Sequence, residues 1–247
     1  MKVDVYTFCY NEMVILPFLV DYWKKYADHV YVYDNGSTDG SIEFLEKFDW
    51  ITVRTYETEG GKDNSKMKEI RNEFWKDSRG KADLVVVCDI DEVLCGKNLR
   101  ESLQKMLDEE CTICKPIWYT FVSETKPVYE TGKLLHENYP LAMLDKGKVL
   151  ILDPNKITES GYGVGAHTCS PKGDVKYYEG GDIFCLHISS NLGIDYKLEK
   201  YKRANARRSP QDIKSKHGVH YAFSEERLRA DYKKLLQRAV DFSKVVS

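Results

Sequence analysis

The chain of 247 residues is long enough for one large α/β domain with a closed hydrophobic core. Its 37 Lys and Arg residues nearly balance its 39 Asp and Glu residues, and the formal net charge of -2 gives no whole-molecule attraction to nucleic acid. No apolar run approaches the roughly 20 residues that span a bilayer, and no leader-like segment precedes the first strand pattern, so we expect a cytoplasmic protein. The seven cysteines are odd in number, and we expect reduced thiols.

The first part of the chain alternates between strand and helix patterns. Strands are predicted where β-branched, aromatic or continuously apolar runs occur, at 3–10, 30–33, 51–53 and 84–88. Helices are predicted where apolar residues recur at helical spacing, at 14–26, 42–45 and 64–76. This alternation predicts an α/β fold with a doubly wound, mostly parallel sheet and ligands at the carboxyl ends of its strands.

The pattern changes after residue 91. A helix is predicted at 99–108, strands at 111–122, 128–130 and 148–152, a long loop at 158–181, and C-terminal helices at 195–208 and 225–242. We therefore expect one compact domain with three parts, at 1–110, 111–192 and 193–247.

Two polar segments follow the second and the fourth strands of the predicted sheet. Asp89 and Asp91 stand one residue apart after a buried apolar strand, and carboxylates at such a strand end can hold Mg²⁺ or Mn²⁺ by hard oxygen ligation. The segment 34–41 follows the second predicted strand and suits a tight loop beneath a nucleoside, since its glycines permit positive φ. We expect both segments to face one shared crevice at the carboxyl edge of the sheet.

In order and spacing, the first hundred residues resemble family 2 glycosyltransferases of the GT-A fold. The matching segments are Tyr10-Asn11-Glu12, Asp34 to Ser41, Arg71-Asn72 and Asp89-Ile90-Asp91-Glu92. The resemblance implies a nucleotide-sugar donor, with UDP as a family-level expectation, and residues 1–110 as the half that binds it. The donor-binding residues implied are Asn11, Glu12, Asp34, Asn35, Asp39, Lys66, Arg71, Asp89 and Lys200. The implied divalent metal, Mn²⁺ or Mg²⁺, would be held by Asp89, Asp91 and His187.

The second half is similar to the back half of bacterial capsular and surface-polysaccharide transferases. The similarity lies in Gly165 to His167, in Cys185 to His187 and in the basic run that starts at Tyr196. It implies that the acceptor is a glycan or a lipid-linked glycan and that residues 111–192 form the strands and loop on the acceptor side. It also implies C-terminal helices at 193–247. The basic run at 197–208 could also attract a phospholipid-linked acceptor and hold the protein peripherally at a membrane.

The general base of an inverting transfer is not identified by any motif. The family usually places it in a downstream Glu-Asp pair, which this chain lacks, and Glu92 stands where a third Asp is usual. Candidates in the predicted loop are Asp182, Glu179 and Glu159, with His167 as a further choice. Asp182 is favoured, because it precedes the strand that ends in His187.

Two other activities fit parts of the sequence. Asp89 and Asp91 also resemble the first motif of haloacid-dehalogenase-type phosphatases, in which the first Asp is a nucleophile, although no adjacent Asp-Asp pair occurs in the chain. A sugar nucleotidyltransferase would use the same nucleotide site. Such enzymes usually carry a Gly-rich basic loop after the first strand, and Tyr10 to Met13 contain neither glycine nor a basic residue.

Overall fold

A computed structural model describes residues 1–58 and 61–246. Its central sheet has seven strands in the order β12-β6-β9-β4-β1-β2-β3, and β4, β1, β2 and β3 are mutually parallel. The four parallel strands are β1 Val3–Cys9, β2 His29–Asp34, β3 Ile51–Thr55 and β4 Leu84–Val87. The strands that extend the sheet are β6 Ile113–Cys114, β9 Ile151–Leu152 and β12 Tyr177–Tyr178. The predicted α/β class with a mostly parallel sheet is confirmed.

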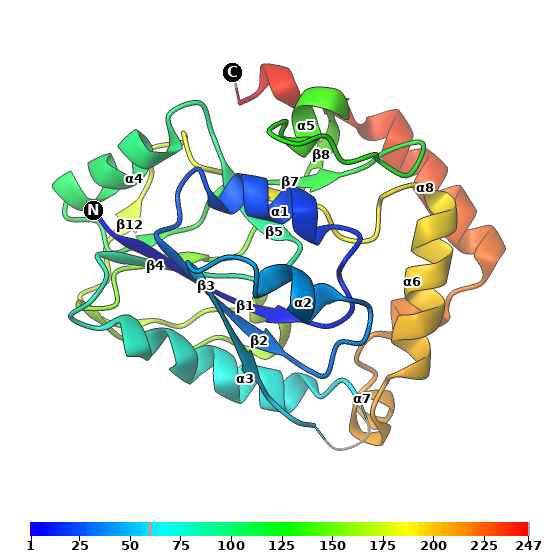
Figure 1. Cartoon of the computed structure of the whole chain (residues 1–247), viewed down its shortest axis with the longest axis horizontal. Coiled ribbons are helices and arrows are strands. Elements are labelled where there is room, and N and C mark those ends of the chain that lie inside the picture. The colour runs from blue at the N-terminus through cyan, green and yellow to red at the C-terminus, as the bar shows by residue number, and fades with distance from the viewer. Residues whose placement is uncertain (59–60, 247) are drawn as a thin grey trace.

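Helices cover both faces of this sheet, as Figure 1 shows, with α1 and α2 on one face and α3 on the other. Their bounds are α1 Leu16–Trp23, α2 Ser41–Leu45 and α3 Asn64–Glu73, which continues as the 3₁₀ turn η1 Phe74–Ser78. Asp63 caps α3 by accepting hydrogen bonds from the backbone N–H groups of Ser65 and Lys66. On the α1 side, the core includes the fully buried Trp23 and Tyr22.

A second sheet of five strands packs beside the first, in the order β14-β8-β7-β13-β5. Its strands are β5 Glu92–Cys95, β7 Ile117–Phe121, β8 Leu141–Leu144, β13 Phe184–His187 and β14 Val240–Asp241. β5 was not predicted; it follows β4 after four residues and pairs antiparallel with β13, so that Glu92 lies opposite His187. The residues between β4 and β5 therefore cross from one sheet to the other.

Two predictions for the middle of the chain are wrong. Residues 128–130 form no strand, and Val128 is 68% exposed. The segment 158–181 is not a plain loop, because it contains short elements that return to the body of the protein. These are β10 Ile157–Glu159, η2 Val164–Ala166, β11 Lys172–Gly173 and β12. β9, β6 and β12 extend the first sheet.

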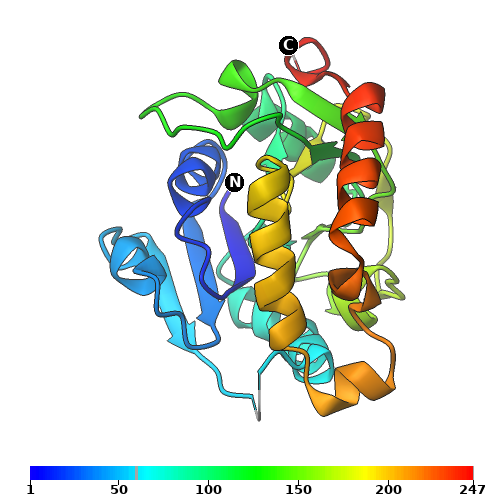
Figure 2. The same ribbon diagram turned by 90° about the vertical axis from the view of Figure 1, so that its right-hand side faces the viewer.

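The remaining helices are α4 Leu99–Asp108, α5 Leu135–Asn138, α6 Ile194–Ala206, α7 Pro210–Lys214 and α8 Glu225–Arg238, with 3₁₀ turns η3 Val219–Ala222 and η4 Phe242–Lys244. Figure 2 shows α6 and α8 side by side. No helix in the described part of the chain is long and apolar enough to cross a membrane. The seven cysteines, all of them described, are free thiols, as expected.

Candidate functional site

A cavity of about 270 Å³ lies where the carboxyl ends of the parallel strands meet. Its strand-end lining is Phe8 to Glu12 at the end of β1, Asn35 after β2, Tyr56 after β3 and Asp89 to Asp91 after β4. Its other walls are Lys62, Asn64, Met67, Arg71, Gly165, Lys200, Arg203, Ala204, Arg207 and Tyr221. The predicted shared crevice between the β2 turn and the β4 end is confirmed, because β1 is the strand between them and both ends line the same cavity.

Asp34 organises the turn after β2. It is fully buried, and one carboxylate oxygen accepts hydrogen bonds from the backbone N–H groups of Gly36 at 2.7 Å and Ser37 at 2.8 Å. Its other oxygen accepts the Ser37 hydroxyl at 2.5 Å, and Gly36 adopts the left-handed φ of 79° that this turn requires. Asp34 thus fixes the shape of the turn from behind and does not line the cavity.

Asn11 joins the loop after β1 to the same turn. Its side-chain oxygen accepts the backbone N–H of Thr38 at 2.7 Å, and its own N–H donates to the Ser37 hydroxyl at 2.8 Å. Asp39 makes a parallel link, accepting the N–H of Met13 at 3.0 Å. Asn11 lines the cavity, whereas Asp39 supports the loop from outside it.

One end of the cavity is aromatic and cationic. The Arg207 guanidinium lies 3.1 Å from the ring centroid of Tyr10 and donates to the Asn35 side-chain oxygen at 2.9 Å. The Asn35 amide in turn donates to the backbone oxygen of Tyr56 at 3.1 Å. These groups offer a flat aromatic surface beside hydrogen-bonding donors and acceptors, which suits a planar heterocycle.

Asp89 lies between two basic residues. One of its carboxylate oxygens pairs with the Arg71 guanidinium, and the other lies 2.8 Å from Lys148 Nζ. Burial works to raise the pKa of Asp89, but the charges of Arg71 and Lys148 outweigh it and hold that pKa well below its usual range. Because both oxygens are engaged, the carboxylate is poorly placed to act as the free nucleophile of a phosphatase.

Glu92, the first residue of β5, shares Lys148 with Asp89. Lys148 Nζ lies 2.5 Å from one Glu92 oxygen, and the other oxygen accepts the backbone N–H of Asp89 at 2.9 Å. Glu92 is 1% exposed, and burial together with the neighbouring charge of Asp89 raises its pKa to about 8. Lys148 is missing from the sequence-based candidates, because no motif surrounds it.

Asp91 faces His187 and Lys200 at the open side of the acidic segment. Its carboxylate lies 3.7 Å from His187 Nε2 and 3.9 Å from Lys200 Nζ. Burial lowers the pKa of His187, which favours the neutral imidazole that a metal needs. Ligand atoms of Asp91, Glu92 and His187 lie within 4.8 Å of one another. A divalent cation fits the donor chemistry of Asp91 and His187, whereas both Glu92 oxygens already have partners.

Lys200 also holds the carboxylate of Glu12. Its Nζ lies 2.8 Å from a Glu12 oxygen, and both side chains line the cavity. Burial raises the pKa of Glu12, and the Lys200 charge opposes that shift. Lys200 and Arg203 on α6 and Arg207, which directly follows the last residue of α6, are three and four residues apart, so this helix presents one basic face to the cavity.

The candidates for the general base lie in different parts of the structure. Asp182 and Glu179 precede β13 at the end opposite His187, and five residues of extended chain put Asp182 about 16 Å from it. Asp182 accepts the Tyr178 hydroxyl at 2.9 Å and lines a different cavity, and Glu179 is exposed and lines neither. The expectation that Asp182 stays near the site is therefore wrong.

His167 is the catalytic candidate that remains beside the cavity. It is exposed, and Gly165, two residues earlier, lines the wall. Although the residue as a whole is exposed, partial burial of the ring lowers the pKa of His167. The charges of Lys148 and Arg71 also lower this pKa, and the charge of Asp89 opposes them. The imidazole is thus neutral near pH 7 and able to accept a proton.

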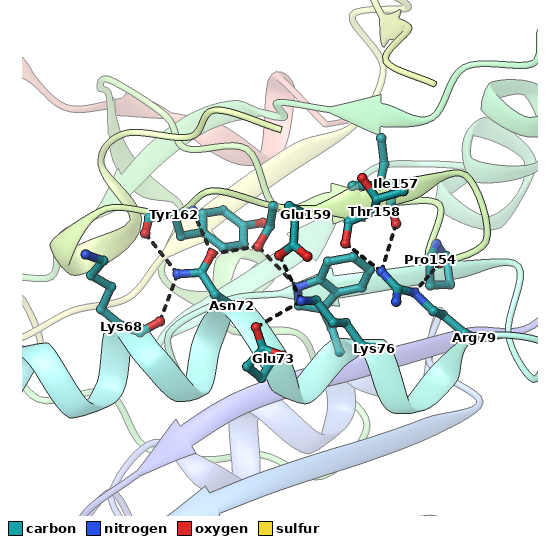
Figure 3. A network of polar contacts seen from close by, with 12 residues as sticks. Lys68, Asn72, Glu73, Lys76, Arg79, Pro154, Ile157, Thr158, Glu159 and Tyr162 are labelled. Atoms are coloured by element: carbon teal, nitrogen blue, oxygen red, sulfur yellow. Dashed lines mark hydrogen bonds and ion pairs between the residues drawn. The ribbon is translucent and has the colours of Figure 1, made fainter. Parts of the chain in front are cut away.

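The segment before His167 is attached to α3 by the polar network of Figure 3. Asn72 accepts the Tyr162 N–H at 2.8 Å and the Ser160 hydroxyl at 2.9 Å, and donates to the Tyr162 carbonyl at 3.0 Å. Lys76, in the turn η1 that continues α3, forms an ion pair with Glu159 at 2.8 Å. Glu159 does not line the cavity. Lys66 lies on the same helix, half exposed and 3.7 Å from Glu69, and does not line the cavity.

Comparison with known proteins shows only distant likeness. No known family profile matches the chain, and no curated protein sequence matches it. Among solved structures, TarS residues 1–349 of S. aureus in complex with UDP-GlcNAc is 12% identical, with a TM-score of 0.44 over 82% of this chain and 65% of that one. A second structure of TarS 1–349 is 12% identical, with a TM-score of 0.47 over 92% and 73%. The chain thus spans about two thirds of the first of these structures.

Proposed function

We propose that the protein is a glycosyltransferase that binds a nucleotide sugar in the cavity at the carboxyl ends of β1, β2 and β4. A UDP-sugar is the first donor to test. The observation that carries the proposal is the distribution of groups along this cavity. An aromatic end with Tyr10 and Tyr56 suits a nucleobase, the basic face of α6 suits a diphosphate, and Asp91, which lines the cavity and faces His187 behind it, suits a metal.

The charges of the cavity favour a polyanionic ligand. Its basic lining residues are Lys62, Arg71, Lys200, Arg203 and Arg207, and its acidic ones are Glu12, Asp89 and Asp91. Arg71 is 2% exposed, and its Nε has no hydrogen-bond partner among the described residues. The lining thus carries five basic side chains against three acidic ones, an excess that favours a polyanion.

A divalent metal held by Asp91 and His187 would neutralise charge on the departing diphosphate. Lys200 and Arg203 would hold the diphosphate from the α6 side, since both line the cavity near Asp91. His167 is our candidate to take the proton from the acceptor hydroxyl. Its neutral imidazole belongs to the segment whose Gly165 lines the same cavity, and a glycan or lipid-linked glycan is the acceptor class we propose.

A panel of nucleotide sugars tests this proposal by thermal shift, with and without Mn²⁺. A ligand present at 100 times its Kd should stabilise the fold by about 2.7 kcal/mol. We expect one nucleotide sugar to raise Tm more with Mn²⁺ than without it, and Asp91→Asn to remove the Mn²⁺-dependent part. Asp182→Asn, outside the cavity, is the matched control and should keep it. A panel without any metal-linked shift would contradict the proposal.

A further inference from the structure

The acidic segment after β4 already contains a cation that the protein itself supplies. Lys148 lies just before β9, is 8% exposed, and places its Nζ 2.8 Å from Asp89 and 2.5 Å from Glu92. Its ammonium also lies 5.6 Å from the ring centroid of Trp118. Lys148 thus occupies the space between two carboxylates that would otherwise be open to a divalent metal.

The charges around Lys148 are balanced without a metal. With Glu92 ionised, the two carboxylates of Asp89 and Glu92 are matched by Arg71 and Lys148; with Glu92 protonated, the group carries net positive charge. Neither state attracts a divalent cation to these four residues. The carboxylate of Asp91 lies outside this arrangement and faces His187.

We propose that Lys148 is a positioning residue that keeps Asp89 and Glu92 from binding the metal and restricts it to Asp91 and His187. Two protein ligands hold Mn²⁺ weakly, because affinity grows with the number of charged ligands. The diphosphate then becomes the group that completes metal binding, so the metal and the nucleotide each strengthen the binding of the other. This inference deepens the proposed function, because it concerns the metal site of the same cavity.

Binding of Mn²⁺ to the nucleotide-free protein, followed by electron paramagnetic resonance, tests the inference without an activity assay. Lys148→Met removes the ammonium and frees Glu92, so we expect Mn²⁺ to bind about tenfold or more tightly than to the wild type. Lys148→Arg keeps the charge and should bind Mn²⁺ within about twofold of the wild type. In the double variant Lys148→Met/Glu92→Gln most of the gain should disappear, because Glu92 is the ligand that was released.

A separate test uses the intact lysine and does not depend on the folding of Lys148→Met. Glu92→Gln keeps one side-chain oxygen, which can accept from Lys148 or from the Asp89 N–H but not from both, and we expect it to leave Mn²⁺ affinity within about twofold. A loss of about fivefold or more would show that Glu92 binds the metal beside Lys148, and the inference would fall. Equal Mn²⁺ affinity of Lys148→Met and the wild type would also overturn it. Both results leave the proposed function standing, since that is decided by the nucleotide-sugar panel.

Discussion

Replacing Lys200 with Met would remove the partner of the Glu12 carboxylate while keeping an unbranched side chain. The two side chains are 19% and 11% exposed and lie 2.8 Å apart. Removing one partner of a buried ion pair costs about 3–5 kcal/mol. Because both partners keep some contact with water, we expect the lower end, about 3 kcal/mol, which lowers Tm by about 6–12 °C in a chain of this length.

The size of this loss should depend on pH. Burial raises the pKa of Glu12 and Lys200 opposes that shift, so the folded-state pKa rises further when Lys200 is removed. A carboxyl group with a raised folded-state pKa contributes its stability below the unfolded pKa and loses it as pH rises toward the folded pKa. The difference in Tm between Lys200→Met and the wild type should therefore be larger at about pH 8 than at about pH 5.

Two further variants separate the charge effect from loss of packing. Lys202→Met makes the same change at an exposed position of the same helix and should alter stability by no more than about 0.5 kcal/mol. Adding Glu12→Gln to Lys200→Met removes the unpaired carboxylate and should restore part of the lost Tm. A loss that is equal at both pH values, and that Glu12→Gln does not reduce, would refute the reasoning.

Three further predictions concern the surroundings of the cavity. Asn72→Ala leaves the backbone groups of Tyr162 without their amide partner, and we expect a loss of about 1–3 kcal/mol in chemical denaturation; an unchanged midpoint would mean that water replaces the amide. Asp182→Asn keeps an acceptor for Tyr178 and should leave turnover within about twofold, whereas a large loss would restore Asp182 as a candidate base. His167→Gln should slow turnover by about 100-fold or more with nucleotide binding retained, and a normal rate would exclude it as the base.

The sequence was most informative where a segment carries its own pattern. The strands of the parallel sheet were predictable, because β1 and β4 are continuous buried runs and β2 and β3 are rich in β-branched and aromatic residues. Helix α4 was predicted with the bounds that the structure has, Leu99–Asp108, since its apolar residues repeat at helical spacing. β5 was missed because its four residues become a strand only by pairing with β13, which is about ninety positions later in the chain.

In the site, too, the predictable residues are those that lie in a segment with its own pattern. Asn35, Asp89 and Asp91 were predicted to meet, because parallel strands end at one edge of a sheet, and they do line one cavity. Lys148 could not be found, since it reaches the site from a distant segment with no motif around it. Arg207 lies in the basic run at 197–208, but nothing in that run indicated that it would contact Asn35. Asp182 was misplaced for a geometric reason. β13 runs toward the site and ends at His187, so Asp182, two residues before the first residue of β13, lies far from His187.

The internal ion pairs also bear on how the cavity would accept a ligand. Lys200 lies closer to Glu12, at 2.8 Å, than to Asp91, at 3.9 Å, and Arg207 donates a hydrogen bond to Asn35. A diphosphate that drew Lys200 away would leave Glu12 without its partner, so part of the new attraction is offset by the lost pair. Glu12 can meet that change by taking up a proton, because burial already raises its pKa. Nucleotide binding should then be accompanied by proton uptake, which calorimetry in buffers of different ionisation enthalpy would measure.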